Sequence, residues 1–594
     1  MKNNPVWIAG IARGHNSSVC LLKDGEVVFN IEEERLSREK YDGGPLHAMY
    51  KILEYTDKLD YLVIAHTQDI TTAGTIDFSG DNMYTGLARK LGLINRKENP
   101  LNHSQVIDMS NKHHTLHAAC AFYRSGFEKA AALVVDGAGT FIPFHDSWLY
   151  ETETILDCSY PDNLRTLYKN VATTGPMLEQ EVLVDGDFFG ESGYQHVSRV
   201  SEKAGIVKVY EAVTDYCGFS FIEAGKTMGL FPYGEPNENI PDLFVKTNMG
   251  DLSDRNLIIP TYPNGAYVNK QIFDELQDVG LEEGQDLSLL KNRRDLAYAC
   301  QTQTQKQVLD LILKAVEMTG HKKVVISGGY GLNCVANYYY LDNLPDDVEI
   351  YVEPVSNDCG TAMGAALLQW YEMSGDTQVR PQVDTLYDGF KYNYTDENIQ
   401  SITKRYNAEL TDASAEDVID LITNKNIVSM FQGKSESGPR ALGNRSILYD
   451  PTDPNGKDHV NEVKRREYFR PFAGSILEED VHEWFELRGM ESSPTMMYAV
   501  NCQPGIEEKI PAIIHVDGTC RIQTVNREQN PHYYDIIKAF KERTGCPIIF
   551  NTSFNLGGEP LVETLEDALW TLQESDIEYC YLPEYGKLVT LKNK

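Results

Sequence analysis

The chain has 594 residues, more than one hydrophobic core usually supports, so we expect at least two domains. Its formal charge of −34 (54 Lys and Arg against 88 Asp and Glu) argues against duplex nucleic acid and anionic membranes as partners. The sequence shows no long apolar run and no secretory leader pattern, so we expect a cytoplasmic protein. The eleven cysteines are dispersed and form no CxxC pair, which argues against a disulfide framework or a zinc ribbon.

The first third of the chain predicts strands that end in glycine-rich turns. Apolar stretches at 6–11, 19–22 and 27–31 are expected strands, and Asp24-Gly25 between the last two is a strong hairpin signal. A helix is expected around 111–124, followed by a strand at 130–135 that runs into DGAGT. The mixed stretch from about 145 to 300 gives no clear subdivision.

A similar layout follows. We expect a helix at 295–319, a strand at 323–327 leading into GGYGLN, a strand at 348–352 and a helix at 360–371. Two such sets indicate an α/β fold that binds ligands at the carboxyl ends of its strands.

The polar, proline-containing stretch 374–389 is typical of a linker. After it we expect helices at 396–406 and 415–424 and a strand at 427–431. We therefore predict an N-terminal domain at 1–375 and a C-terminal α/β domain at 390–594, whose last strand or helix can pack back on the first domain.

Four residues form a predicted metal-binding set. His113 and His117 are four residues apart in NKHHTLHAA, which places both imidazoles on one face of a helix. Asp136 ends an apolar strand, and Asp358 precedes the glycine-rich start of a helix. Two imidazoles and two carboxylates suit Fe(II), Mn(II) or Zn(II). Each residue also has a simpler interpretation, as a core or surface histidine, a turn aspartate or an N-cap.

Two glycine-rich turns allow the backbone to approach a phosphate closely. SGGYGLN, at 327–333, follows a strand but lacks the Gly-Lys-Ser/Thr ending of a Walker A loop. AGKTMGL, at 224–230, places Lys226 between two glycines. Either turn is equally compatible with a purely structural role.

Cationic residues in the second half predict an anion pocket. They lie in FQGKSESGPRALGNRSIL, VKRREYFRPFAG and DGTCRIQTV, beside aromatic and proline residues that limit their hydration. A poorly hydrated cation needs an anion, and the guanidinium fork matches phosphate oxygens. Arg465 suits a solvated surface equally well. With two residues of FNTSFNLGGEP, the predicted phosphate-binding set is Arg440, Arg445, Lys464, Arg466, Arg470, Arg521, Asn551 and Ser553.

Several motifs occur together between residue 14 and about residue 560. Besides those above, they are GHNSSVCLLKDGEVV, EEERLSREK, VVDGAGT and NEVKRREYFRPFAGSIL, and the most specific are GPRALGNRSI and REYFRPFA. In this order they resemble the O-carbamoyltransferases of the nodulation-factor and antibiotic-tailoring type, which include the aminoglycoside carbamoyltransferase of nebramycin biosynthesis.

The resemblance implies an N-terminal domain of the actin-like ATPase type, similar to the tRNA-threonylcarbamoyl transferase TsaD, and a YrdC-like second domain. The YrdC-like domain would convert carbamoyl phosphate and ATP, with Mg(II), to carbamoyl adenylate and pyrophosphate. The TsaD-like domain would pass the carbamoyl group to a hydroxyl of a small acceptor that the sequence does not identify. ATP and a divalent metal, Fe(II) first, are the implied cofactors, and a homodimer is compatible with the family.

The resemblance also implies roles for single residues. The metal ligands are the two histidines and two aspartates named above. The carbamoyl phosphate and ATP pocket is Arg440, Lys464, Arg470, Arg521, Asn551 and Ser553. The motif match gives His15, Lys40 and Lys226 as catalytic residues of the transfer site, and Gly328, Gly329 and Asn333 as nucleotide contacts. Many members have His-Asp where this chain has His15-Asn16, so the general base stays unassigned.

Three other classes of protein share part of this pattern. A tRNA-threonylcarbamoylating enzyme needs a basic RNA-binding face, which a charge of −34 disfavours. Hydrogenase-maturation carbamoyltransferases carry an acylphosphatase domain and CxxC zinc fingers, and the sequence contains neither. A non-catalytic nucleotide-binding scaffold on the actin-like fold has no use for a cationic pocket.

Overall fold

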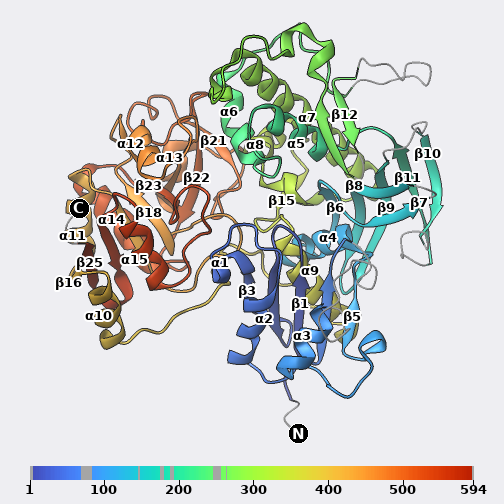
Figure 1. Ribbon diagram of the computed structural model, residues 1–594, viewed down its shortest axis with the longest axis horizontal. Coiled ribbons are helices and arrows are strands. Elements are labelled where there is room, and N and C mark those ends of the chain that lie inside the picture. The colour runs from blue at the N-terminus through green and yellow to red at the C-terminus, as the bar shows by residue number, and fades with distance from the viewer. Residues whose placement is uncertain are drawn as a thin grey trace. The chain divides into compact units, whose positions relative to one another are not determined.

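The computed structural model describes residues 4–67, 83–144, 147–173, 180–186, 193–244, 256–261 and 264–591. The chain forms two compact units (Figure 1). Residues 1–14, 18–27 and 49–382 make up the first unit, and residues 15–17, 28–48 and 383–594 make up the second. Two short N-terminal pieces thus belong with the C-terminal part of the chain, while the family-domain boundary near 375–390 stays a prediction.

The first sheet has five strands in the order β3-β2-β1-β4-β5. Strand β1 pairs antiparallel with β2 and parallel with β4, and β4 pairs parallel with β5. The predicted hairpin is confirmed, because Asp24 and Gly25 both adopt positive φ (52° and 81°) between β2 and β3. The strands are β1 (Trp7–Ala12), β2 (Ser18–Lys23), β3 (Glu26–Glu32), β4 (Tyr61–Ala65) and β5 (Val106–Asp108).

The second sheet follows the order β10-β11-β9-β8-β6-β14-β15, and β7 pairs with β8. Much of the region that the sequence left undivided forms strands β8 to β11 of this sheet, in which β8 and β9, like β10 and β11, pair antiparallel, while β9 and β11 pair parallel. The strands are β6 (Lys129–Val135), β7 (Phe141–Phe144), β8 (Ser147–Ser159), β9 (Asn163–Thr173), β10 (Gln180–Asp185), β11 (Gln195–Ser201), β14 (Lys323–Ser327) and β15 (Glu349–Val352).

The two sheets share one connection pattern. Strand β6 pairs antiparallel with β8 and parallel with β14, as β1 does with β2 and β4. The orders β3-β2-β1-β4-β5 and β9-β8-β6-β14-β15 are therefore equivalent. The duplicated α/β fold that the sequence predicts is confirmed, and the repeated order agrees with the actin-like ATPase type that the resemblance implied.

Two helices fill the layers between these sheets. Helix α9 (Cys359–Ser374) contacts β1, β2 and β4, while α4 (His113–Arg124) contacts β6, β8 and β14. The helices approach closely, because a Cβ added to Gly364 of α9 would lie 1.9 Å from the carbonyl oxygen of Leu116 in α4. This packing holds the N-termini of α4 and α9, which carry three predicted metal ligands.

The rest of the first unit surrounds this core. Helix α7 (Lys291–Thr319) is followed by Gly320, whose φ of 72° is typical of a helix C-terminus. The helix therefore ends where the predicted 295–319 helix ends. None of the helices in the described ranges is long and apolar enough to cross a bilayer. All eleven cysteines lie in the described ranges, where they are buried and form no disulfide bond. Further elements are α3 (Met83–Leu91), α5 (Ile206–Tyr216), α6 (Ala224–Leu230), α8 (Cys334–Asn343), β12 (Ile258–Thr261) and β13 (Gly265–Val268).

The second unit contains a ten-stranded mixed sheet in the order β16-β25-β24-β17-β18-β23-β19-β22-β21-β20. Its long central strands are buried, as in β18, β19 and β23. The strands are β16 (Ala408–Asp412), β17 (Val428–Phe431), β18 (Arg445–Tyr449), β19 (Ala473–Leu477), β20 (Phe485–Glu486), β21 (Ala499–Cys502), β22 (Thr519–Val525), β23 (Ile548–Ser553), β24 (Tyr579–Leu582) and β25 (Lys587–Leu591).

Helices accompany this sheet, and three of them begin with a capping box, in which the N-cap and N3 residues exchange hydrogen bonds. These three are α10 (Asp396–Arg405), α11 (Ala415–Thr423) and α15 (Leu565–Gln573). The first two match the helices predicted at 396–406 and 415–424. Short helix α1 (Glu33–Ser37) belongs to this unit, as do α12 (Gly456–Val463) and α14 (Pro531–Thr544).

Candidate functional site

Four side chains of the first unit converge on one point. The Nε2 atoms of His113 and His117 lie 3.2 Å apart. Asp136 Oδ2 lies 3.3 and 3.8 Å from these two nitrogens, and Asp358 Oδ1 lies 3.7 and 3.6 Å from them. All four ligand atoms lie within 4.8 Å of one another. The structure therefore brings together the four residues that the sequence proposed as a metal set.

Local structure explains this convergence. His113 and His117 occupy the first turns of α4, one helical turn apart on the same face. Asp136 follows β6, and its Oδ1 accepts the N–H of Gly329 at 3.1 Å, which leaves Oδ2 toward the histidines. Asp358 is at the N-cap position of α9 but makes no capping hydrogen bond, so the simpler interpretation as a cap does not account for its carboxylate.

The charges within the cluster support each other. Burial alone would raise the pKa of Asp136, but the hydrogen bond with His113 and the charge of His117 hold this pKa well below its usual range. Burial opposes protonation of His113, yet Asp136 and Asp358 raise its pKa. A buried set that balances imidazolium against carboxylate can bind a metal ion in exchange for the imidazolium protons, which pass to solvent.

The spacing and the donors fit a divalent cation. Separations of 3.2 to 3.8 Å between neighbouring ligand atoms are those that metal bonds of about 2.0–2.2 Å impose. Imidazole nitrogen with carboxylate oxygen suits Fe(II), Mn(II) or Zn(II) better than Ca(II), which prefers oxygen alone.

A buried ion pair beside the cluster was not anticipated from the sequence. Lys169 on β9 donates to Glu151 on β8, and both side chains are almost fully buried. Glu151 also accepts the N–H of Thr140 at 2.9 Å, and Thr140 Oγ1 accepts the N–H of His113 at 3.2 Å. Burial raises the pKa of Glu151, but Lys169 overcomes this and lowers it to about 2. The pair is thus linked through Thr140 to the start of α4. The only sign of it in the sequence is the pair of glutamates at alternate positions of β8.

The SGGYGLN turn is bound to the cluster through its glycines. Gly328 has a φ of 88°, and an added Cβ would lie 2.3 Å from the carbonyl oxygen of Val135. Gly329 donates its N–H to the metal-set aspartate, as described above. Asn333 caps α8 by accepting from Ala336, and its amide exchanges two hydrogen bonds with Gln301. Its side chain is therefore engaged within the protein, and its contact with a nucleotide stays a prediction.

The three predicted transfer residues fall in different places. Lys226 belongs to the first unit, where its Nζ lies 2.9 Å from Glu223 Oε1. Lys40 belongs to the second unit and lies 2.6 Å from Glu34 Oε1. His15 is exposed and also belongs to the second unit. Their catalytic roles stay predictions.

Four cations gather in the second unit. Burial lowers the pKa of Lys464 well below its usual value, and Arg466 and Arg470 lower it further. Burial likewise lowers the pKa of Arg466, with Arg470 and Arg521 as the next causes. Charged groups that shift each other's pKa in this way lie close together. Segment 464–470 and strand β22 therefore form one positive cluster.

Part of the cluster lacks internal partners. Among the described residues, the guanidinium of Arg466 has one hydrogen-bond acceptor, the carbonyl oxygen of Pro471 at 3.0 Å. The Nε atoms of Arg466 and Arg521 are buried without any acceptor in the part of the chain that the structure describes. Buried donors of this kind are rare in proteins, and a bound anion would supply the acceptors that they lack.

The sheet provides the floor beneath these cations. Ala473 of β19 lies opposite both Arg521 of β22 and Asn551 of β23, and Ala499 of β21 lies opposite Arg521 on its other side. Directly opposed residues point to the same face of a sheet, so two alanines flank Arg521 and leave room above the strands. Asn551 Nδ2 donates to Ser475 Oγ at 3.0 Å, which fixes its orientation on that floor.

The remaining residues of the predicted pocket differ in their surroundings. Ser553 accepts from Lys464 through its carbonyl oxygen, beside Asn555, whose carbonyl accepts the same ammonium at 2.8 Å. The motif FNTSFNLGG held Asn555, but only Asn551 and Ser553 were predicted from it. Arg440 is half-buried in the loop before β18.

Arg445 differs from the rest of the cationic set. It is fully buried, and its guanidinium donates to the carbonyl oxygens of Gln432 and Glu563 and lies 3.9 Å from the centre of the Phe431 ring. These contacts favour a structural role, and its contact with an anion stays a prediction.

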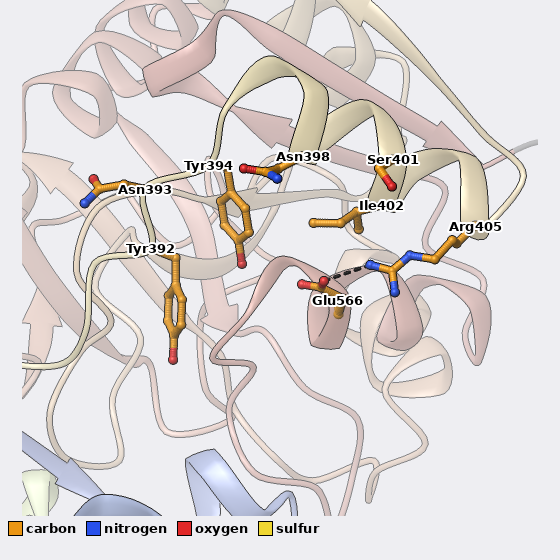
Figure 2. Close-up of a pocket in the computed structure, with 8 residues that line it drawn as sticks. All are labelled: Tyr392, Asn393, Tyr394, Asn398, Ser401, Ile402, Arg405 and Glu566. Atoms are coloured by element: carbon orange, nitrogen blue, oxygen red, sulfur yellow. Dashed lines mark hydrogen bonds and ion pairs between the residues drawn. The ribbon is translucent and has the colours of Figure 1, made fainter. Parts of the chain in front are cut away.

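A cavity of about 340 Å³ opens elsewhere in the second unit (Figure 2). Its polar groups already interact within the protein. Tyr394 Oη accepts the N–H of Leu565 at 2.9 Å, and Asn398 completes the capping box of α10. Arg405 forms an ion pair with Glu566 at 2.9 Å. None of the predicted site residues lines it. The lining residues are Tyr392, Asn393, Tyr394, Asn398, Ser401, Ile402, Arg405 and Glu566.

Known proteins resemble this chain over most of its length. The family model described as the carbamoyltransferase N-terminus matches residues 69–367, and the carbamoyltransferase C-terminus matches residues 419–587. The nodulation protein NolNO of Sinorhizobium fredii is 30% identical over 96% of this chain and 78% of that protein. The nodulation protein NolO of Bradyrhizobium diazoefficiens is 32% identical over 78% of this chain and 76% of that protein.

A solved structure of full-length HypF, in a phosphate- and nucleotide-bound form, is 14% identical with a TM-score of 0.36. The alignment covers 63% of this chain and 47% of HypF, so this chain spans about half the length of that protein. The family models cover both halves of the sequence, and the identity to NolNO extends across nearly all of it. The chain belongs to the carbamoyltransferase family and is a transferase.

Proposed function

We propose that the chain is an ATP-dependent O-carbamoyltransferase. In the first reaction, carbamoyl phosphate, ATP and one water give carbamoyl adenylate, pyrophosphate and orthophosphate. Orthophosphate must be a product, because carbamoyl adenylate keeps only the α-phosphate of ATP. In the second reaction, the oxygen of an acceptor hydroxyl displaces AMP from the carbamoyl carbon, and the hydroxyl proton passes to a base.

The positive cluster of the second unit is the observation that carries the proposal. Lys464 is 2% exposed, and its burial, together with the charges of Arg466 and Arg470, lowers its pKa well below the usual value. A phosphate bound among Lys464, Arg466, Arg470 and Arg521 would favour the charged form of Lys464 and give the buried Nε–H groups acceptors. Each charge-assisted hydrogen bond contributes roughly 1.5–3 kcal/mol, so a few suffice for specific binding of carbamoyl phosphate and the ATP phosphates.

The metal set of the first unit supports the transfer reaction. A divalent cation held by His113, His117, Asp136 and Asp358 would supply Lewis acidity toward a carbamoyl or phosphate oxygen. We propose Fe(II) as this cation, on the family resemblance and the mixed nitrogen–oxygen donors. The N–H of Gly329 orients Asp136 and thereby links the glycine turn, where we propose that the nucleotide binds, to the metal set.

The acceptor is proposed to be a small alcohol. The charge of −34 disfavours a polyanionic acceptor such as tRNA, which needs clustered Lys and Arg on an open face. A neutral or cationic small molecule meets no such barrier.

Release of pyrophosphate tests the proposal. We expect ATP to yield pyrophosphate only when carbamoyl phosphate is present, with an equal amount of orthophosphate. Arg470→Met should abolish this release, whereas Arg405→Met, which breaks an exposed ion pair in the same unit, should leave it unchanged. Pyrophosphate release that does not depend on carbamoyl phosphate, or none at all, would contradict the proposal.

Two further measurements address its finer parts. Elemental analysis of the purified protein should find one metal per chain, and iron if the Fe(II) assignment is right. Candidate alcohols incubated with the enzyme, carbamoyl phosphate and ATP can be analysed by mass spectrometry. The true acceptor should gain the mass of one carbamoyl group.

A further inference from the structure

A short N-terminal segment of the second unit holds the loops of the predicted donor pocket. Arg35 in α1 is 2% exposed, although it carries a charge. Its two terminal nitrogens donate to backbone carbonyl oxygens more than 400 positions later in the sequence, those of Glu436 at 3.2 Å and Gly438 at 2.6 Å. One guanidinium therefore binds the carbonyl oxygens of the two residues that flank Ser437. The hydroxyl of Ser437 lies 2.6 Å from Asn30 Nδ2.

Arg38 makes an equivalent grip on a second loop. Its two terminal nitrogens donate to the carbonyl oxygens of Leu561 at 2.6 Å and Pro560 at 3.1 Å. Its backbone adopts a φ of 64° at the end of α1, so the segment turns sharply at this residue. Both arginines thus donate from their two terminal nitrogens to a pair of backbone carbonyl oxygens, in addition to the carboxylates of Glu32 and Asp567 nearby.

The first gripped loop leads to the floor of the pocket. Glu436 accepts the N–H groups of Leu442 at 2.7 Å and Asn444 at 2.9 Å, which closes residues 436–444 into a compact loop that carries Arg440. Within this loop, the carbonyl oxygen of Ala441 accepts from Asn551 Nδ2 at 3.2 Å. A shift of the loop would therefore move Arg440 and remove one of the hydrogen-bond acceptors of Asn551.

The second gripped loop leads to Lys464. Residues 554–561 connect β23 to the Leu561 carbonyl held by Arg38. The carbonyl and Oδ1 of Asn555 accept from Lys464 Nζ at 2.8 and 3.2 Å, and the N–H of Gly557 donates to the Lys464 carbonyl at 2.8 Å. The position of the Lys464 ammonium therefore depends on this loop.

The surroundings of Arg35 keep it charged and in place. Burial would lower its pKa, but Glu32, at 3.4 Å, and the charges of Glu34, Glu563 and Glu436 raise it. A lysine would keep the charge but has a single nitrogen, which cannot reach two carbonyls from two ends of a rigid fork.

We infer that Arg35 and Arg38 are positioning residues for the donor pocket, which they act on through the loops 436–444 and 554–561. The inference rests on the proposed function, because the ligand that the pocket would hold is carbamoyl phosphate. Neither arginine needs to touch the ligand. Together they set the distance between Arg440, Asn551 and Lys464, on which simultaneous contact with one phosphate depends.

The test uses Arg35→Lys and Arg38→Lys in the full chain, with Arg405→Lys as the matched control on the same unit. Three quantities are measured: the affinity for orthophosphate by calorimetry, the KM for carbamoyl phosphate and for ATP in pyrophosphate release, and the melting temperature. We expect Arg35→Lys and Arg38→Lys to weaken orthophosphate binding and raise the KM for carbamoyl phosphate roughly tenfold or more, because loosened loops misplace the ligands. The kcat should change less, and the control should match the wild type.

The outcomes separate positioning from general stability. The inference is wrong if both variants bind orthophosphate like the wild type. It is also wrong if their KM is unchanged and their kcat falls only as far as the fraction of folded protein falls. If Arg35→Lys fails to fold, Arg38→Lys decides alone, since its side chain is 28% exposed and tolerates the change better. If the wild type binds orthophosphate but releases no pyrophosphate, the proposed function fails while calorimetry still decides the positioning role.

Discussion

Replacing Arg466 by methionine is expected to remove anion binding while leaving the anion-free fold at least as stable as before. The guanidinium of Arg466 has only the Pro471 carbonyl as an acceptor among the described residues, and it stacks 4.5 Å from the centre of the Phe472 ring. Lys464, Arg470 and Arg521 surround it with charge of the same sign. In the free protein this arginine therefore contributes few favourable contacts.

The magnitudes of the two effects can be compared. Methionine loses one hydrogen bond, about 1 kcal/mol, but keeps a contact with the Phe472 ring worth about 0.3–1.5 kcal/mol. It also removes repulsion between like charges, on the order of 1 kcal/mol for each close pair near the surface. With three such neighbours, the relieved repulsion outweighs the lost hydrogen bond, so the free energy of unfolding should stay level or rise by up to about 2 kcal/mol. Binding should lose a charge-assisted hydrogen bond of roughly 1.5–3 kcal/mol, which is a 10- to 150-fold weaker affinity.

Urea unfolding with and without orthophosphate measures both terms. Orthophosphate at about 100 times its dissociation constant should stabilise the wild type by roughly 2.7 kcal/mol and should stabilise Arg466→Met far less. Arg405→Met is the control and should respond to orthophosphate as the wild type does. A loss of more than about 2 kcal/mol by Arg466→Met in phosphate-free buffer would refute the reasoning, because the guanidinium would then have internal partners.

Three further outcomes are expected. Between the lowered pKa of Lys464 and its usual value the unfolded chain binds more protons than the folded one, so stability rises with pH there; urea titrations across alkaline pH should show a flatter slope for Lys464→Met. Asp136→Asn should lose metal, because a neutral amide replaces a buried carboxylate ligand, and elemental analysis after dialysis measures this. Gly364→Ala should cost about 1–3 kcal/mol or more in chemical denaturation, because its Cβ would lie 1.9 Å from the Leu116 carbonyl oxygen.

Local patterns in the sequence were enough where the chemistry is local. Asp24-Gly25 predicted the hairpin because both residues tolerate positive φ, and the structure confirms it. The pair His113 and His117 shares a helix face by geometry alone, and Asp136 follows a strand whose end faces the same region. The strands from β8 to β11 were not recognised, since β10 is mostly exposed and β8 carries charges that pair inside the fold.

Long-range partners decided the rest. Arg445 and Asn333 are of the right residue type to bind a ligand, yet their donors meet Glu563 and Gln301, which lie 118 and 32 positions away. Sequence alone cannot show that a donor is already satisfied. The same limit hid Arg35, whose acceptors are 401 and 403 positions away, because its motif EEERLSREK indicates only a short charged helix.

The acidic surface and the positive cluster have opposite effects on an anionic donor. The net charge of −34 repels a phosphate in bulk water, but beyond about 10 Å salt screens that field at ordinary ionic strength. Within the positive cluster, Lys464, Arg466, Arg470 and Arg521 would act on a bound anion at short range, and their partial burial lowers the effective dielectric and strengthens each contact. Anions that fail to reach all of these contacts gain little and meet only the repulsion. The combination therefore favours a small phosphorylated donor over a large polyanion.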